Sequence, residues 1–342
     1  MSSKSAGIIT LYASQNFGAF LQGYAMQTTL QKLGYTPEFI KYSGLDIHEF
    51  LFMVKTKNVR LAAFRLMQFA KYMRSRNLLK VAQSRYHGEY KDAVVIGSDT
   101  LWDVQNPTIH DSNFYLGKGL NCNNIIAYAP SANGTSPKEF CDHYGSDEKF
   151  DAFTAIGVRD NNTAKLVQDV SGKKAEIVLD PTLLLKKEDY PVVKPQEQYK
   201  YVLVYGYSFR PEEQKVIKEY ANRIGVKTIS IGLLNSWCDK NVVATVPEFL
   251  GYINSAEGIF TATFHGTIFS IIMEKQFITF ARSNYKVLDI LEKLGLNSRN
   301  ASQANVDCSI LMEKKIDYFS VNERIAFLRE KSMSFLRDSL GD

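Results

Sequence analysis

A histidine, an arginine and an aspartate stand where apolar, strand-like runs of this sequence end. His265 follows the run GIFTAT, Arg159 follows AIGV, and Asp99 follows AVVIGS. An imidazole, with an ordinary pKa of about 6.5, suits proton transfer near neutrality. A guanidinium can hold a carboxylate through two parallel N–H bonds. The three residue types together predict acid–base chemistry on an anionic substrate.

Polar loops of the same kind recur after other strand-like runs. They are Ser14 to Gly18 (SQNFG), Gly97 to Trp102 (GSDTLW), Arg159 and Asp160, Gly206 to Arg210 (GYSFR), and His265 to Thr267 (HGT). In open parallel sheets, ligands bind at the carboxyl ends of strands, where helix N-termini offer N–H groups to anions. We therefore expect such loops to collect an anionic substrate in a cleft between two sheets. The sequence has no GxGxxG after its first strand and no GxxxxGK[ST], which disfavours dinucleotide and P-loop binding.

Structural roles stay open for the same residues. They are a half-buried structural histidine at His265, a helix cap at Asp99, a surface partner of Asp160 at Arg159, turn geometry at Gly18 and Gly206, and a core position for Trp102. Each signal is weak by itself. Because every one of these loops directly follows a strand, their joint position favours a binding site.

The elements that must position these residues alternate along the chain. Strand-like runs separated by helical patterns predict an α/β fold with mostly parallel sheets. A length of 342 residues suggests two domains. The polar segment 186–198, with two prolines, is the best linker, so we predict domains at 1–190 and 191–342. A capping box at Ser320 and Glu323 predicts a terminal helix over 320–340.

Composition narrows the class of protein. The four cysteines form no C-x-x-C pair, which indicates reduced thiols rather than disulfides or a metal site. No apolar run is long enough for a signal peptide or a membrane span, so we expect a cytoplasmic protein. The net charge of +5 is concentrated in residues 51–86, which hold nine Lys or Arg and no acidic residue. One local basic patch argues against a general nucleic-acid binder.

Six blocks of the sequence, in order, resemble the polysaccharide pyruvyl transferase family. They are GIIT…NFGAFLQGYAMQTTLQKLGY, VVIGSDTLW, YAPSAN, VRDNNT, LDPTLLL and FHGTIFSIIMEKQFI, between about residue 7 and about residue 296. The resemblance implies two Rossmann-like domains facing a cleft, the arrangement called GT-B. It also implies pyruvate transfer from phosphoenolpyruvate to two hydroxyls of a sugar as a ketal, in capsular or exopolysaccharide biosynthesis. Since nothing is oxidised in that reaction, no cofactor or metal is expected.

The resemblance also suggests roles for residues. It implies His265 as the family's histidine and Arg159 as its donor-binding arginine. The resulting assignment is catalytic for His265 and Asp99; donor-binding for Arg159, Gly206, Ser208, Arg210, Gly266 and Thr267; and acceptor-binding for Asn16, Gly18, Ser98 and Trp102. We expect the Gly266 and Thr267 amides to be free for an anion, and hold Arg210 in reserve for the phosphate.

Two departures from the family keep other functions open. Ala262 stands where many relatives carry an acidic residue, and Thr263 where some carry an arginine. A catalytically silent sugar-binding protein is therefore one alternative. A glycosyltransferase that uses a nucleotide sugar is another, because the implied fold is shared.

The basic segment 51–86 suggests a membrane partner. An apolar stripe at helical spacing is flanked by cations; the stripe is Val59, Ala62, Leu66, Phe69 and Met73, and the cations beside it are Arg60, Lys71 and Arg74. If the acceptor is a lipid-linked oligosaccharide, such a helix could dock on anionic lipid at the inner face of the membrane. In the alternative, the stripe packs on the first domain and the charges form a solvated face.

Overall fold

The chain is known from a computed structural model that describes residues 4–12, 15–41, 56–106, 112–282, 284–302 and 307–341. Ser14 and the first five residues of segment 51–86 lie outside these ranges. The chain divides into two compact units. The first comprises Met1–Glu49, Asn77–Leu185 and Ala326–Asp342, and the second comprises Phe50–Arg76 and Lys186–Ile325.

The first unit is built on a six-stranded sheet in the order β2-β1-β3-β4-β5-β6, with every pair of neighbours parallel. Its strands are β1 (Lys4–Ile9), β2 (Tyr35–Phe39), β3 (Ala93–Ile96), β4 (Ile125–Tyr128), β5 (Ala155–Val158) and β6 (Glu176–Ile177). The central strands are apolar throughout because helices bury them on both faces. The strand order reverses between β1 and β3, which makes the carboxyl end of these strands the expected ligand position.

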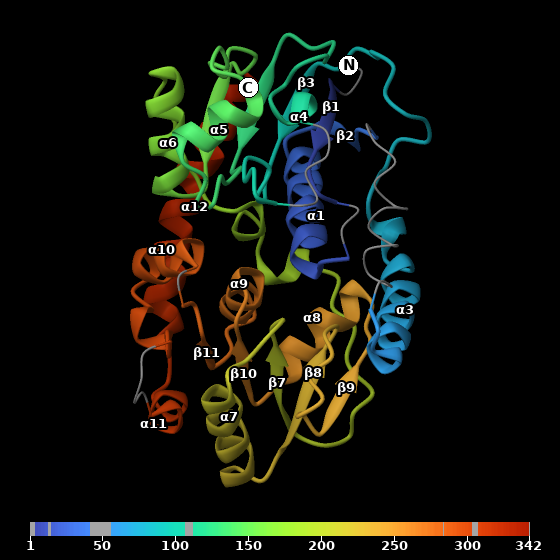
Figure 1. Cartoon of the computed structure of the whole chain (residues 1–342), viewed down its shortest axis with the longest axis vertical. Helices are drawn as coiled ribbons and strands as arrows, with labels where there is room; N and C mark the ends of the chain where they lie inside the picture. The colour runs from blue at the N-terminus through green and yellow to red at the C-terminus, as the bar shows by residue number, and fades with distance from the viewer. Residues whose placement is uncertain are drawn as a thin grey trace. The chain divides into compact units, whose positions relative to one another are not determined.

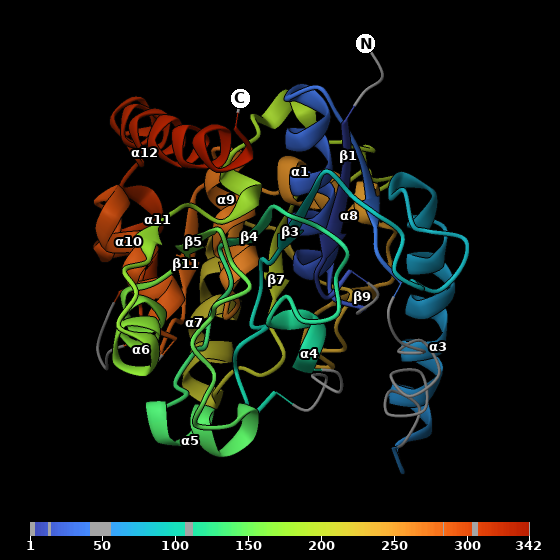
Figure 2. The ribbon, with the colours of Figure 1, turned by 90° about the horizontal axis from the view of Figure 1, so that it is seen from above.

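Helices cover both faces of this sheet. They are α1 (Phe17–Lys32), α4 (Ser112–Tyr115), α5 (Pro137–Tyr144), α6 (Asn161–Ser171) and the later part of α12 (Tyr318–Leu340), with the short 3-10 helices η1 (Arg76–Leu78) and η2 (Pro181–Leu183). Figure 2 shows α1 and α12 on one side of the sheet and α5 and α6 on the other. The core between the sheet and α5 and α6 includes Trp102, Phe140 and Leu166.

The second unit repeats the plan with a five-stranded parallel sheet in the order β11-β10-β7-β8-β9. Its strands are β7 (Tyr201–Tyr205), β8 (Lys227–Ile231), β9 (Lys240–Val242), β10 (Gly258–Thr261) and β11 (Phe277–Thr279). Its helices are α3 (Val59–Met73), α7 (Pro211–Arg223), α8 (Val246–Ser255), α9 (Phe264–Ile272), α10 (Tyr285–Leu294), α11 (Cys308–Glu313) and the start of α12, with η3 (Lys187–Asp189) and η4 (Asn297–Arg299). The prediction of an α/β chain with two Rossmann-like sheets is confirmed (Figure 1).

The division of the chain differs from the predicted domains in two places. The boundary between Leu185 and Lys186 lies close to the predicted 190/191, but α3 belongs to the second unit rather than the first. Its partners explain this, because the side-chain amide of Gln68 bonds both backbone groups of Ala244 at 2.9 Å. The terminal helix passes from the second unit to the first at residues 325 and 326.

The start of that terminal helix also differs from the prediction. The helix begins at Tyr318, and Asp317 accepts hydrogen bonds from the Phe319 and Ser320 amides and from the Ser320 hydroxyl. Ser320 therefore lies inside the first turn, and Asp317 has the capping role that was predicted for Ser320.

Candidate active site

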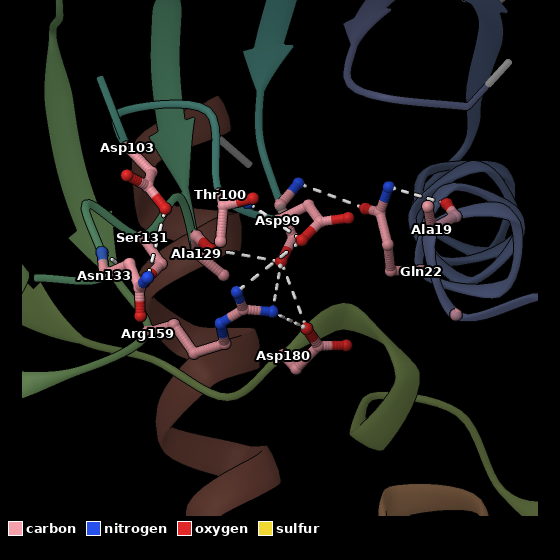
Figure 3. A network of polar contacts seen from close by, with 12 residues as sticks. Ala19, Gln22, Asp99, Thr100, Asp103, Ala129, Ser131, Asn133, Arg159 and Asp180 are labelled. Atoms are coloured by element: carbon pink, nitrogen blue, oxygen red, sulfur yellow. Dashed lines mark hydrogen bonds and ion pairs between the residues drawn. The ribbon is translucent and has the colours of Figure 1, made fainter. Parts of the chain in front are cut away.

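A buried polar network occupies the carboxyl end of the first sheet (Figure 3). Nη1 of Arg159, which follows β5, donates to Oδ2 of Asp180 at 2.7 Å. The hydroxyl of Ser98, which follows β3, lies 3.1 Å from the same Asp180 oxygen and 3.1 Å from the carbonyl of Ala129. Ser98 and Asp180 are almost completely buried, and Arg159 is 5% exposed. Groups that follow β3, β4 and β5 therefore meet at the ion pair between Arg159 and Asp180.

A glutamine from α1 completes this network on its other side. Gln22 accepts a hydrogen bond from the Ser98 amide at 3.1 Å and donates to the hydroxyl of Thr10 at 2.7 Å. Thr10, which follows β1, in turn donates to the carbonyl of Ser98 at 3.0 Å. All three side chains are buried. The Ser98 backbone is thus held on both sides, and this fixes the direction in which the next residue leaves the sheet.

That next residue, Asp99, is the more exposed acid of the network. Its side chain is 15% exposed against 1% for Asp180, and its Oδ1 lies 4.0 Å from Nη2 of Arg159. Its backbone is left-handed, with φ 78°, a conformation that is uncommon outside glycine and is enriched at functional sites. Residues 100–106 form turns and irregular backbone rather than a helix, so Asp99 is not a helix cap.

The surface pairing considered for Arg159 is wrong. Arg159 is buried against Asp180, whereas Asp160 caps α6 by accepting from the Thr163 amide at 2.8 Å. The other Asp160 oxygen accepts from the hydroxyl of Ser131 at 2.6 Å. Burial, followed by the charge of Asp180, raises the pKa of the neighbouring Tyr128 well above its ordinary value. The region is therefore buried, and Asp180 supplies its arginine with an internal counter-charge.

Direct acceptor contacts predicted in the first unit need correction. Trp102 is completely buried between Phe150 and Phe153, and its indole N–H donates to the carbonyl of Tyr115 at 3.0 Å. It is therefore a core residue, as the structural alternative proposed. Ser98 is likewise buried, and its hydroxyl donates to Asp180 and to the carbonyl of Ala129.

Asn16 and Gly18 serve the start of α1. Asn16 is the N-cap, and its side-chain oxygen accepts hydrogen bonds from the amides of Gly18 at 2.8 Å and Ala19 at 3.4 Å. The Gly18 amide therefore donates its hydrogen bond to the N-cap of its own helix. Both residues therefore have a structural role at the start of this helix.

In the second unit, His265 lies in the first turn of α9, directly after β10. It is 7% exposed and belongs to the helix rather than to a loop. The predicted free amides are wrong: Gly266 donates to Oγ1 of Thr263 at 3.0 Å, and Thr267 donates to the carbonyl of Thr263 at 3.2 Å. Thr263 is thus the N-cap of α9 and orients its first turn.

The loop after β7 contains the other predicted donor residues. Gly206 lies against the ring of Phe209, and a Cβ added to Gly206 would come within 2.7 Å of that ring. The Gly206 carbonyl accepts a hydrogen bond from the side-chain amide of Asn235 at 3.1 Å. Ser208 and Arg210 are exposed at the end of this loop. Gly206 therefore holds the close packing of the loop, while Ser208 and Arg210 are the accessible residues.

Sequence reasoning missed a second arginine at this edge of the sheet. Arg282 follows β11, and its Nη2 donates to Glu213 of α7 at 2.6 Å and to the carbonyl of Ser208 at 3.3 Å. The loops after β11 and β7 are thereby joined, and the strand between them in the sheet, β10, is the one that leads to His265. The run QFITFA directly before Arg282 was the available signal, because it obeys the same rule of a polar residue after a strand.

Both units thus present an α/β sheet whose carboxyl edge carries charged and polar residues. In the first unit the structure brings Ser98, Asp99 and Arg159 together. In the second it brings the loop of Gly206, Ser208 and Arg210 to the strand next to that of His265. Such edges are typical of proteins of the Rossmann-like class.

The comparisons identify the family. The family model described as polysaccharide pyruvyl transferase matches residues 16–284, most of the chain. The chain therefore belongs to the polysaccharide pyruvyl transferase family, as its sequence blocks predicted, and this membership indicates a transferase. A search of curated protein sequences finds no significant match.

Similar solved structures include three carbohydrate-related enzymes. The glycosyltransferase SnogD from Streptomyces nogalater is 13% identical, with 97% of this chain and 96% of that chain covered and a TM-score of 0.43. The UDP-GlcNAc 2-epimerase from Methanocaldococcus jannaschii is 11% identical, with 96% and 94% covered and a TM-score of 0.47. The spinosyn rhamnosyltransferase SpnG is 10% identical, with 99% and 96% covered and a TM-score of 0.42.

Among the residues that the structure describes, no helix is long and apolar enough to cross a bilayer.

Proposed function

We propose that this protein transfers pyruvate from phosphoenolpyruvate to two hydroxyls of a sugar, forming a cyclic ketal in cell-surface polysaccharide biosynthesis. The observation that carries the proposal is the position of His265 in a chain of this family. It opens a helix at the carboxyl end of β10, and the strands on either side of β10 lead to Arg210 and Arg282. A proton-transfer group and two cations therefore follow three adjacent strands.

The reaction needs one proton donor and one proton acceptor and changes no oxidation state. Protonation of C3 of phosphoenolpyruvate gives C2 the character of an oxocarbenium ion. One sugar hydroxyl then attacks C2 and loses its proton. The C2–O bond to phosphate breaks, the second hydroxyl closes the ring, and its proton leaves with the phosphate as hydrogen phosphate. The product gains one pyruvate less one water. We assign the transfer of the C3 proton to His265, because an imidazole suits proton transfer near neutrality. General acid–base catalysis of this kind is typically worth about 10²–10⁴-fold.

The donor carries a phosphate and a carboxylate, so its binding needs positive charge. Arg210 is exposed at the N-terminus of α7, where the helix dipole adds to its attraction for an anion. Arg282 is 30% exposed and is held beside Ser208, which can donate its hydroxyl. We assign the phosphate to Arg210 and Ser208, with Arg282 as support.

The first unit supplies the remaining residues of the proposal. Arg159 stays our candidate for the donor carboxylate. Asp99, the more exposed acid of its network, is our candidate for accepting a proton from the sugar hydroxyl. The buried contacts of Ser98 and Gln22 support such a role because they fix the backbone that carries Asp99.

The proposal is tested by incubating the full chain with phosphoenolpyruvate and a panel of nitrophenyl and lipid-linked sugars. We expect sugar-dependent release of phosphate and a product heavier by one pyruvate less one water. Parallel reactions contain nucleotide sugars in place of phosphoenolpyruvate. Release of nucleoside diphosphate there, with no ketal in the first set, would favour a glycosyltransferase. Sugar binding without turnover of either donor would favour a silent sugar-binding protein.

A further inference from the structure

Helix α3 packs on the second unit through one buried face. Phe64, Gln68 and Tyr72, spaced four residues apart, are its buried positions. Gln68 bonds the backbone of Ala244 next to β9, and Lys71 pairs with Glu248 of α8 at 3.0 Å. Figure 1 shows α3 beside β9 at the edge of the second sheet. The opposite face of α3 is therefore turned away from the unit that holds it.

That outer face is apolar. Val59 is 82% exposed, Met67 is 54% exposed and Leu66 is 43% exposed. Ala63 and Ala70 lie between them at helical spacing and are also exposed. A surface helix of a globular unit normally turns its polar residues to water and its apolar residues to the core. In α3 the inner face buries Phe64 and Tyr72 beside Gln68, yet further large apolar side chains face out, which indicates that something else covers them.

Cations border this apolar strip at both ends. Lys57 and Arg60 are exposed at its start, and Arg74 is exposed at its end. The sequence from 51 to 86 contains no acidic residue, so no carboxylate of the segment itself offsets them. The surface formed by Lys57, Val59, Arg60, Ala63, Leu66, Met67, Ala70 and Arg74, here called the α3 outer face, thus offers apolar contact and positive charge together.

We propose that the α3 outer face docks on an anionic lipid surface. The charge complementarity fits phospholipid headgroups, and an apolar strip along one helix fits insertion at the boundary between headgroups and acyl chains. The exposed residues differ from the stripe predicted from the sequence, because Ala62, Phe69 and Met73 are only partly exposed and Met67 faces out. The second unit holds α3 through its other face, where Phe64, Gln68 and Tyr72 are buried.

The inference goes beyond the proposed function and is tested without catalysis. The full chain is sedimented with vesicles of phosphatidylcholine alone and with vesicles in which roughly a third of the lipid is phosphatidylserine, each at low and high salt. We expect binding to the anionic vesicles at low salt, with at least about tenfold weaker binding at high salt or without phosphatidylserine.

Three variants distinguish the α3 outer face from general charge. Arg60→Glu/Arg74→Glu should weaken binding to anionic vesicles about tenfold or more. Leu66→Ser/Met67→Ser should weaken it while leaving every charge in place. Lys215→Glu/Lys218→Glu, an equal charge reversal on exposed positions of α7 in the same unit, should bind like the wild type. All are exposed positions, and thermal unfolding checks that each variant is folded.

Three results would overturn the inference. They are binding to neither vesicle, binding equal for both lipid compositions, and equal losses in the α3 and α7 charge reversals. The last of these would mean that net charge, rather than this helix, attracts the protein to lipid.

Discussion

Arg159 and Asp180 form a buried ion pair in which Nη1 and Oδ2 are 2.7 Å apart. Their side chains are 4% and 1% exposed, so neither charge is solvated by bulk water. Removing one partner of such a pair leaves an uncompensated buried charge, which is far more costly than exchanging both partners for apolar residues. The relationship therefore links the candidate site of the first unit to the stability of that unit.

Asp180→Ala should lower the free energy of unfolding by about 3–5 kcal/mol, since it strands the guanidinium of Arg159. The paired change Arg159→Met/Asp180→Leu should lose less stability than Asp180→Ala alone, because no charge stays buried. Urea unfolding of the three proteins measures both effects. Equal losses in the single and paired variants would show that packing, rather than charge, dominates at this position.

Arg159→Lys separates the structural role of this residue from its proposed role in donor binding. The lysine keeps a positive charge for Asp180 but lacks the planar fork that binds a carboxylate through two bonds. If Arg159 holds the donor, KM for phosphoenolpyruvate should rise about tenfold or more while KM for the sugar changes little. Initial rates with each substrate varied in turn provide the comparison. Equal increases for both substrates would indicate that Arg159 acts only through the fold of its network.

His265→Gln should reduce turnover by roughly 10²-fold or more, within the range of general acid–base catalysis. Glutamine is close to histidine in size and keeps the first turn of α9 filled. It is a better test than alanine because His265 is buried rather than in a loop. Phosphate release is measured beside thermal unfolding. A variant that unfolds like the wild type and turns over at the wild-type rate would remove His265 from the mechanism.

Local sequence patterns suffice to predict the sheets of this chain but not the packing of distant segments. The alternation of apolar runs and helices predicted two parallel sheets, because buried strands must be apolar along their whole length. By contrast, α3 contacts Ala244, which lies 176 residues away in the sequence, and no local pattern encodes such a pairing. Its assignment to the first domain followed from proximity in the sequence alone.

Within the candidate site, the residue types were predictable and their contacts were not. The strand-then-polar rule found Asp99, Arg159 and His265, and applied evenly it would also have found Arg282. It could not show that Trp102 points into the core, since an aromatic residue after a strand suits both positions. The hydrogen bond from the Gly266 amide to Thr263 could have been predicted from the sequence, because a threonine before an apolar helix is a common N-cap.

A pH-dependent contribution to stability is expected where α3 meets α8. Burial opposes ionisation of Glu248, but hydrogen bonds from Thr245 and Lys71 and the charge of Lys71 outweigh it, so the pKa lies below its ordinary 4.5. A lowered pKa stabilises the folded state above about pH 4.5, and that stabilisation is lost as the pH falls through the folded value. Lys71→Met should therefore be less stable than the wild type by about 0.2–1 kcal/mol near neutrality, and the gap should narrow as the pH falls below 4.5. Urea midpoints at neutral and at acidic pH measure it, and a gap independent of pH would contradict the ion pair.

Gly266→Ala tests whether the close packing of α9 on β10 positions His265. A Cβ at this glycine would lie 2.1 Å from Oγ1 of Thr261 and 2.7 Å from Oγ1 of Thr263, the atom that caps the helix. Thr261 is itself held by a 2.7 Å bond to the carbonyl of Tyr205, so the first turn of α9 has to shift instead. We expect a loss of about 1–3 kcal/mol in stability, as for other overpacked sites. Turnover should fall by about 10²-fold, because a displacement of about 1 Å of a catalytic group can have that effect.

Gly134→Ala is the matched control, since a Cβ there has no heavy atom within 4 Å and the change should leave activity and stability near wild type. If Gly266→Ala lowered stability with turnover intact in the folded protein, the packing of α9 would matter for the fold and not for the placement of His265.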